Sequence, residues 1–257
     1  MLPVVQIGRF ALQLPGLLLI LGVWLGLSQA ETAARRRGLP VDALTAVVGL
    51  SLLFGLLAAR LGYVLVNLPA YIPRPFDAFT LTPSALDGWS GIVGGAAAAL
   101  ILATRRRLPL PLLLDALAPG LAAFSVFLGL SHLASGAAFG AETELPWAIR
   151  LWGTLRHPTQ AYEAVAGLLA FTLVRRRADP VPGQTFLLWL GAAGFSVLVI
   201  EGFRGDSLLG PWGIRVRQVP ALLLGLGPLW RFGKLARGAS TAGASSAPMS
   251  QEGSSHA

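Results

Sequence analysis

Histidine, glutamine and glutamate lie close together in one polar segment, HPTQAYE at residues 157–163. Proline fits the first turn of a helix, where its missing N–H group costs nothing. Gln160 and Glu163 are then three residues apart on one face of that helix, with His157 at its start. Such a group of side chains can bind a polar head group or position a water molecule. A plain capped helix is the structural alternative.

Ionisable residues also lie within long apolar runs. Arg60 lies in the run 43–68, and Asp115 and His132 lie near the start and the end of the run 110–133. A charged side chain in a membrane interior is costly unless it has a partner or a function. These positions are therefore candidates for a buried site.

A third group of charges follows the apolar run that ends near residue 200. Glu201 and Arg204 are three residues apart, which places both on one helix face, and Asp206, Arg215 and Arg217 follow them. An ion pair at a helix end and a functional site explain this group equally well.

Seven apolar windows are available to position these residues in a membrane. Hydrophobic residues make up 54% of the chain and charged residues 12%, about half of the roughly 25% charged share of a soluble domain. A spanning helix needs about 20 mainly apolar residues, and helices satisfy their own backbone groups in lipid. The sequence therefore predicts an all-α membrane protein, a bundle of about seven transmembrane helices. The windows are 7–27, 43–68, 88–103, 110–133, 160–174, 185–200 and 216–229.

Arginine triplets at 35–37, 105–107 and 175–177 each follow an apolar window, and a looser basic set lies at 231–237. Basic residues near helix ends stay on the cytoplasmic side, so we expect the N-terminus outside and the C-terminus in the cytoplasm. Attraction to anionic lipid head groups accounts for the net charge of +8 better than nucleic-acid binding does. We expect a transmembrane domain over 1–230 and a basic, then disordered, cytoplasmic tail over 231–257.

Three further features of the sequence bear on its chemistry, its helix packing and its first helix. The chain has no cysteine, which excludes a thiolate nucleophile and a cysteine metal site. The glycine-rich stretch 88–95 allows helices to approach closely. The first helix resembles a signal peptide, but the arginine triplet after it favours a retained helix that enters from outside.

The polar motifs resemble those of one family, the prolipoprotein diacylglyceryl transferases of bacterial inner membranes. HPTQAYE at 157–163 is similar to the family's His-Pro-(Ser/Thr)-Gln-Leu-Tyr-Glu, and the matches run collinearly from about residue 7 to 230. Weaker matches are at 59–65, 113–119, 145–147, 201–204 and Gln218.

The resemblance implies an activity. Members move the diacylglyceryl group of phosphatidylglycerol to the cysteine thiol of a prolipoprotein and release glycerol phosphate, with no metal or other cofactor. The reaction needs cations that hold the phosphate and a base for the thiol. Guanidinium groups suit the first task because they bind phosphate through two parallel hydrogen bonds. The implied partners are phosphatidylglycerol, other membrane lipids and prolipoprotein signal peptides, with no nucleic acid.

Five positions depart from the family pattern. Ser90 stands at the position of a histidine, and Gly129 and Val197 stand at the positions of arginines. Pro15 aligns with a tyrosine and His132 with an asparagine. The chain is therefore either a transferase that binds the phosphate with other arginines, or a paralogue that binds lipid without catalysis or with altered specificity.

The expected site combines the motif residues with the retained charges. The expected catalytic residues are His157, Glu201 and Arg204, with His157 preferred to His132 as the base. The expected substrate-binding residues are Arg60, Tyr63, Gly94, Gly95, His132, Gln160, Tyr162, Glu163, Arg215, Arg217 and Gln218.

Overall fold

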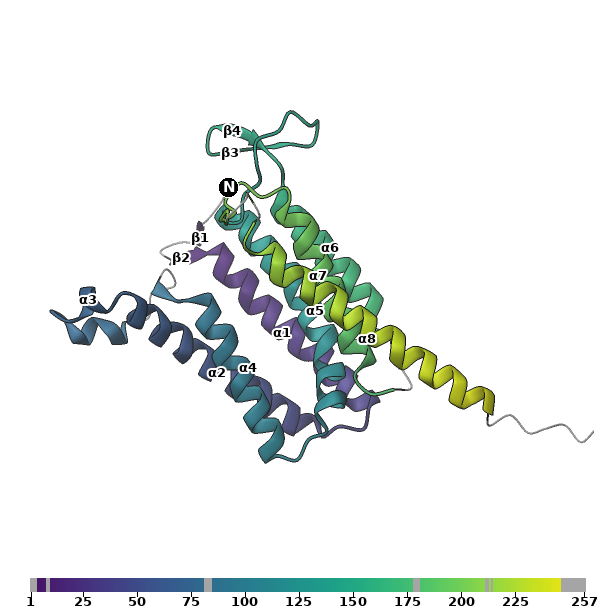
Figure 1. Cartoon of the computed structure of the whole chain (residues 1–257). Coiled ribbons are helices and arrows are strands. Elements are labelled where there is room, and N and C mark those ends of the chain that lie inside the picture. Colours follow the sequence, from purple (N-terminus) through teal and green to yellow (C-terminus); the bar gives the residue numbers. More distant parts are fainter. Residues whose placement is uncertain are drawn as a thin grey trace, which may run out of the picture.

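Long helices dominate the computed structural model, which describes residues 4–7, 10–80, 85–177, 181–210, 213 and 215–245 (Figure 1). Each predicted apolar window overlaps one of these helices. A short helix, α3 (Leu68–Tyr71), and a 3-10 turn, Pro75–Phe79, follow the second long helix. The long helices are α1 (Leu14–Arg36), α2 (Val41–Val66), α4 (Gly88–Arg105), α5 (Leu110–Ser135), α6 (Thr159–Val174), α7 (Gln184–Glu201) and α8 (Gln218–Ser245).

Four of the helices, α1, α2, α5 and α7, are long and apolar enough to cross a membrane by length and composition. Many of their large apolar side chains, such as Trp24 and Leu57, are exposed on the outside of the bundle. Exposed apolar faces of this extent match a lipid environment, so the fold is that of a mainly helical membrane protein.

The helical fold also carries two short antiparallel hairpins outside the long helices. β1 (Val4–Ile7) pairs with β2 (Phe10–Gln13), so the first helix begins at Leu14, well after the start of its predicted window. β3 (Ile149–Leu151) pairs with β4 (Thr154–Arg156) in the segment before α6. Trp152 and Gly153 both have positive φ angles, 55° and 86°, as a two-residue hairpin turn requires.

The arginine triplets gather at one end of the bundle, here called the arginine end. Arg36 donates to the carbonyl oxygen of Arg175 and Arg37 to that of Arg177, each at 3.3 Å. Next to these contacts a core of buried alanine, leucine and valine side chains joins α1, α2, α4 and α5; it includes Ala34, Leu44, Ala103 and Leu113.

Helices α2 and α4 form a closely packed pair. A Cβ atom on Gly62 would lie 2.1 Å from Ser90 Oγ, and one on Gly94 would lie 2.2 Å from Ala58 Cβ. Small residues let the two backbones approach, as is common in membrane helices. The pair extends to one side of α5–α8 (Figure 1) and contacts α1 and α5 far less than its members contact each other.

A buried carboxylate ties α5 to the start of α7. Asp115 on α5 is 2% exposed, and its two oxygens accept hydrogen bonds from the backbone N–H groups of Gly183 (2.7 Å) and Phe186 (2.8 Å). Gly183 is the N-cap residue of α7 and Phe186 lies in its first turn, where helix donors have no partner within the helix. Asp115 therefore acts as a helix cap supplied by a neighbouring helix.

Replacing Asp115 with alanine is expected to lower the free energy of unfolding by about 2 kcal/mol, because two buried N–H groups lose their acceptors. Asparagine keeps one acceptor oxygen and should lose less. The thermal unfolding temperature in detergent checks this, with the exposed Asp42 replaced by alanine as the control. An unchanged unfolding temperature for Asp115→Ala would contradict the capping role.

Candidate functional site

A cavity of about 710 Å³ lies between the start of α4 and the helices α5–α8. Most of its wall is apolar: Trp89 and Ile92 come from α4, Leu128 from α5, and Val197 and Leu224 from α7 and α8. The charged and titratable side chains in the lining are His132, Glu163, Glu201, Arg204 and Arg217.

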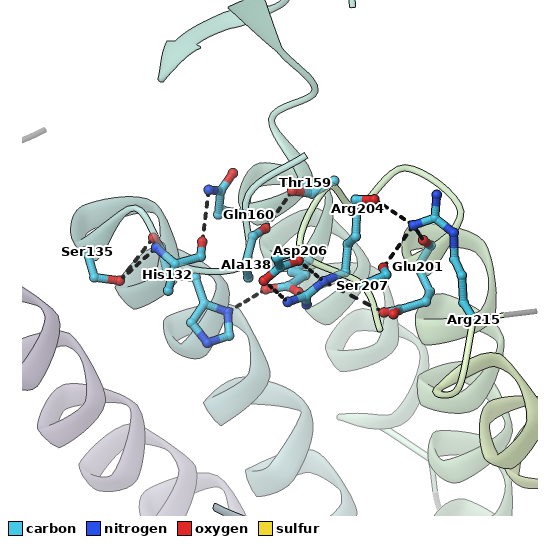
Figure 2. Close-up of polar contacts among 12 residues, drawn as sticks. His132, Ser135, Ala138, Thr159, Gln160, Glu201, Arg204, Asp206, Ser207 and Arg215 are labelled. Carbon is cyan, nitrogen blue, oxygen red and sulfur yellow. Dashed lines mark hydrogen bonds and ion pairs between the residues drawn. The ribbon is translucent and has the colours of Figure 1, made fainter. Parts of the chain in front are cut away.

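Arg204 is the centre of an ion cluster in this cavity (Figure 2). Its Nε and Nη2 atoms donate to the two oxygens of Asp206 at 2.9 and 2.8 Å, and Nη1 donates to Glu163 Oε1 at 3.0 Å. Glu201 Oε2 lies 3.7 Å from Nε. A guanidinium carries five N–H groups, so these three hydrogen bonds leave two available to a ligand.

The charge on Arg204 is fixed by these neighbours. Burial by itself would lower the pKa of the guanidinium, but the hydrogen bond and the charge of Asp206 and the charges of Glu163 and Glu201 raise that pKa overall. Arg204 is therefore a cation at the polar end of an apolar cavity, held among three carboxylates.

Glu201 contributes an unused acceptor to the cavity. Its side chain is 2% exposed, and Oε1 has no hydrogen-bond partner among the described residues. Buried oxygens in native proteins are nearly always hydrogen-bonded, so this atom is available to a hydroxyl group of a ligand. Gln160 Oε1 is likewise buried and unpartnered among the described residues, while its Nε2 donates to Ala137 O at 2.9 Å. Gln160 does not line the cavity.

Arg215 holds the segment that carries the cluster. Its Nη1 atom lies 2.5 Å from the carbonyl oxygens of both Glu201 and Arg204 and 2.8 Å from Ser207 Oγ (Figure 2). Arg217, two residues further on, lines the cavity, and its guanidinium has no hydrogen-bond or ion-pair partner within the described part of the chain. Gln218 begins α8 and lies outside the cavity lining.

The expected base and its motif tyrosine lie in a second, smaller hollow. His157, Tyr162, Trp147 and Phe203 line a space of about 410 Å³ that shares only Ile200 with the cavity. His157 Nδ1 is 3.5 Å from the Tyr162 hydroxyl, which accepts a hydrogen bond from Trp147 Nε1 at 2.8 Å. His157 and Tyr162, both expected site residues, therefore lie in the smaller hollow and not in the cavity that holds the ion cluster.

The remaining expected residues lie on the α2–α4 pair, outside the cavity lining. Arg60 is buried and donates to three backbone carbonyls, those of Asp77 (2.7 Å), Ala78 (2.8 Å) and Ala85 (2.9 Å). Tyr63 lies beside it, with the guanidinium 5.9 Å from the ring centre. These contacts hold the loop between α2 and α4. Gly94 and Gly95 face α2.

The positions that depart from the family pattern have definite structural roles. A Cβ atom on Gly129 would lie 2.5 Å from the backbone nitrogen of Ala164, so α5 and α6 meet where the family carries an arginine. Pro15 O accepts a hydrogen bond from Ser131. Val197 lines the cavity.

Ser90 helps to start α4 in place of the family's histidine. Its backbone N–H donates to the helix-capping Asp87 at 2.7 Å, and hydrogen bonds from its hydroxyl and its backbone lower the pKa of Asp87. Ser90 also fills the space opposite Gly62 and is absent from the cavity lining. The structure therefore offers no cavity histidine at this position.

Taken together, a membrane-type helical bundle with an apolar chamber and ionic groups at one end defines a protein that handles amphiphilic lipids. The comparisons with known proteins make this specific. The family model for prolipoprotein diacylglyceryl transferase matches residues 3–232, and the chain belongs to this family.

Curated relatives carry the name phosphatidylglycerol–prolipoprotein diacylglyceryl transferase. The protein from Synechococcus elongatus is 30% identical over 89% of this chain and 86% of its own length. That from Trichormus variabilis is 32% identical over 85% and 83%, and one from Staphylococcus aureus is 30% identical over 85% and 83%. The predicted family is confirmed.

Proposed function

We propose that this chain transfers the diacylglyceryl group of phosphatidylglycerol to the cysteine thiol of a prolipoprotein and releases glycerol phosphate. Membership of the family and the names of the relatives support this function. The structural observation that carries it is the cavity, in which an apolar wall leads to Arg204 and the unpaired Arg217. Acyl chains fit such a wall, and a phosphate group fits two guanidinium groups.

The head group of phosphatidylglycerol would meet three groups in the cavity. Arg217 and the two remaining N–H groups of Arg204 bind the phosphate oxygens, because charge-assisted hydrogen bonds are the strong ones. Glu201 Oε1 accepts a hydrogen bond from a glycerol hydroxyl. His132 in the cavity and His157 in the smaller hollow are the two candidates for the base that takes the thiol proton.

The function can be tested with the purified protein, phosphatidylglycerol and a lipobox peptide. We expect glycerol phosphate release that requires the cysteine of the peptide and stops when this cysteine is replaced by serine. The lipidated peptide should appear by mass spectrometry in equal amount. A folded preparation that binds the lipid and yields neither product would overturn the proposed function in favour of lipid binding without transfer.

Replacing Arg217 with glutamine is expected to raise KM for phosphatidylglycerol about 10- to 100-fold, the equivalent of one charge-assisted hydrogen bond. Lysine keeps the charge but not the paired donors, so its effect should be smaller. Initial rates across a series of lipid concentrations measure this. The matched control is Arg74→Gln in the exposed loop after α3. An unchanged KM for Arg217→Gln would remove Arg217 from the phosphate site.

We further propose that the seven long helices cross the inner membrane, with the ends of α1 and α8 extending beyond it. This gives a multi-pass protein with seven crossings and the N-terminus outside. The clustering of the triplets at the arginine end supports this orientation.

The chain has no cysteine, so single cysteines can be introduced at Thr104 and Thr143. In intact cells, a membrane-impermeant maleimide should label position 143 and spare position 104; the reverse pattern would contradict the orientation.

A further inference from the structure

His132 and Glu163 form a close pair between α5 and α6. His132 Nδ1 lies 2.7 Å from Glu163 Oε2, and the other oxygen of Glu163 accepts the hydrogen bond from Arg204. Both residues line the cavity, and the His132 side chain is 29% exposed. The pair is therefore held on one side and open to a ligand on the other.

The contacts of Glu163 fix which nitrogen of His132 carries the proton. A carboxylate can only accept hydrogen bonds, and both oxygens of Glu163 lie within hydrogen-bond distance of a nitrogen atom, so we assign Nδ1 as the donor. In the neutral ring, Nε2 then keeps its lone pair. Nε2 has no hydrogen-bond partner within the described residues, which leaves it free to accept a proton from a molecule in the cavity.

Glu163 also stabilises the ring after it has taken a proton. A carboxylate bound to the Nδ1 side of a histidine orients the ring and stabilises the imidazolium, as in catalytic triads. The other charged groups around this pair are Arg204, Asp206, Glu201 and Arg217. Arg204 is shared among three carboxylates, and it contacts Glu163 through the oxygen that His132 does not use.

His157 lacks these features. Its Nδ1 is 3.5 Å from the uncharged Tyr162 hydroxyl, and its ring packs against Phe203 with the ring centres 5.1 Å apart. No carboxylate contacts its ring among the described residues, and it lies in the smaller hollow rather than in the cavity with Arg204 and Arg217. These surroundings suit packing or recognition better than proton transfer.

We propose that His132, oriented by Glu163, is the general base of this chain, at a position where the family pattern has asparagine. The inference rests on the proposed function. His132 Nε2 takes the proton of the acceptor thiol while the sulfur attacks the glyceryl carbon that carries the phosphate. The new C–S bond forms as the C–O bond breaks, and glycerol phosphate leaves with the electron pair of that bond. The imidazolium then returns its proton to the released phosphate, so atoms and charge balance.

The test is the pH dependence of the transfer rate at saturating phosphatidylglycerol for wild type, His132→Asn and Glu163→Gln. We expect His132→Asn to reduce kcat at pH 7.5 by about 10²–10⁴-fold, with KM for the lipid within about threefold of wild type. Its residual rate should rise about tenfold per pH unit towards the ordinary thiol pKa of about 8.5, because only thiolate that is already ionised can react. Glu163→Gln should show a smaller loss in kcat, about 10-fold.

Several results would overturn the proposal. His132→Asn with kcat within threefold of wild type at every pH would do so, as would the expected rate and pH pattern in His157→Asn instead. Thr172→Ala, on the exposed side of α6, is the control and should stay within twofold of wild type. If wild type itself shows no thiol-dependent release, the proposed function fails first, and this outcome is distinct from failure of His132 alone.

A measurement on the wild-type protein guards against misfolding of the variants. Nitrogen-15 spectra of labelled histidine at alkaline pH should show one ring protonated at Nδ1 and unprotonated at Nε2, whose signals disappear in His132→Gln. A ring 132 that is protonated at Nε2 would overturn the proposal without any activity measurement.

Discussion

Replacing Arg204 with glutamine is expected to reduce the rate of diacylglyceryl transfer by about 10²–10³-fold, the usual effect of removing one preorganised charge donor. The substitution removes the cation that binds Asp206 and Glu163 and approaches Glu201. It also leaves the buried Glu201 without its nearby cation and removes the hydrogen bond that holds Glu163 beside His132. The same initial-rate assay of glycerol phosphate release measures this loss.

Two companion variants separate catalysis from folding. Arg204→Lys keeps the charge but cannot bind Asp206 through two parallel hydrogen bonds, and its rate should fall between wild type and Arg204→Gln. Arg35→Gln, which removes an exposed pair with Glu31 at the arginine end, should leave the rate unchanged. A rate for Arg204→Gln within threefold of wild type, in folded protein, would show that the ion cluster is only structural.

Restoring the arginine of the family at position 129 is expected to damage the protein rather than improve it. A side chain on Gly129 would meet the Ala164 backbone nitrogen at 2.5 Å and the Gln160 carbonyl oxygen at 3.0 Å. Helix backbones cannot yield as side chains do, so Gly129→Arg should lower the free energy of unfolding by about 3 kcal/mol or more. The thermal unfolding temperature in detergent, with and without phosphatidylglycerol, is the measurement.

Gly49→Ala on α2 is the matched control, because no atom lies within 4 Å of its added Cβ. This variant should unfold at the wild-type temperature or slightly above it, since alanine favours a helix more than glycine does. A Gly129→Arg variant as stable as wild type and more active would contradict this prediction. In that case α5 and α6 would have to separate at this point, and the arginine at position 129 would bind the phosphate.

The helices and the family could be predicted from the sequence, because both depend on local patterns. Apolar windows mark helices in lipid, and the segment 157–163 carries enough unusual residues to identify the family. The hairpin over 149–156 was missed, since its strands have three residues each. Gly153 after Trp152 was the available signal for its turn.

The composition of the site could be predicted only in part, because its contacts join residues far apart in the chain. Glu201 with Arg204 is a local pair, and its spacing was sufficient. His132 and Glu163 are separated by 31 residues, and their contact depends on how closely Gly129 lets α5 approach α6. Arg60 is expected to bind substrate, and the structure adds that it donates to three loop carbonyls outside the cavity lining; sequence patterns do not reveal such partners.

The α2–α4 pair is attached to the other helices mainly at one end and lines the cavity at the other. Its attachment to α1 and α5 is the small core at the arginine end, and the cavity residues Trp89 and Ile92 lie at the opposite end of α4. Helix α2 has 26 residues, which is about 39 Å at 1.5 Å per residue, so a rotation of roughly 5° at the core moves the far end by roughly 3 Å. A rotation of that size about the core would change the width of the cavity at Trp89 and Ile92, whereas the residues of the ion cluster lie outside the α2–α4 pair.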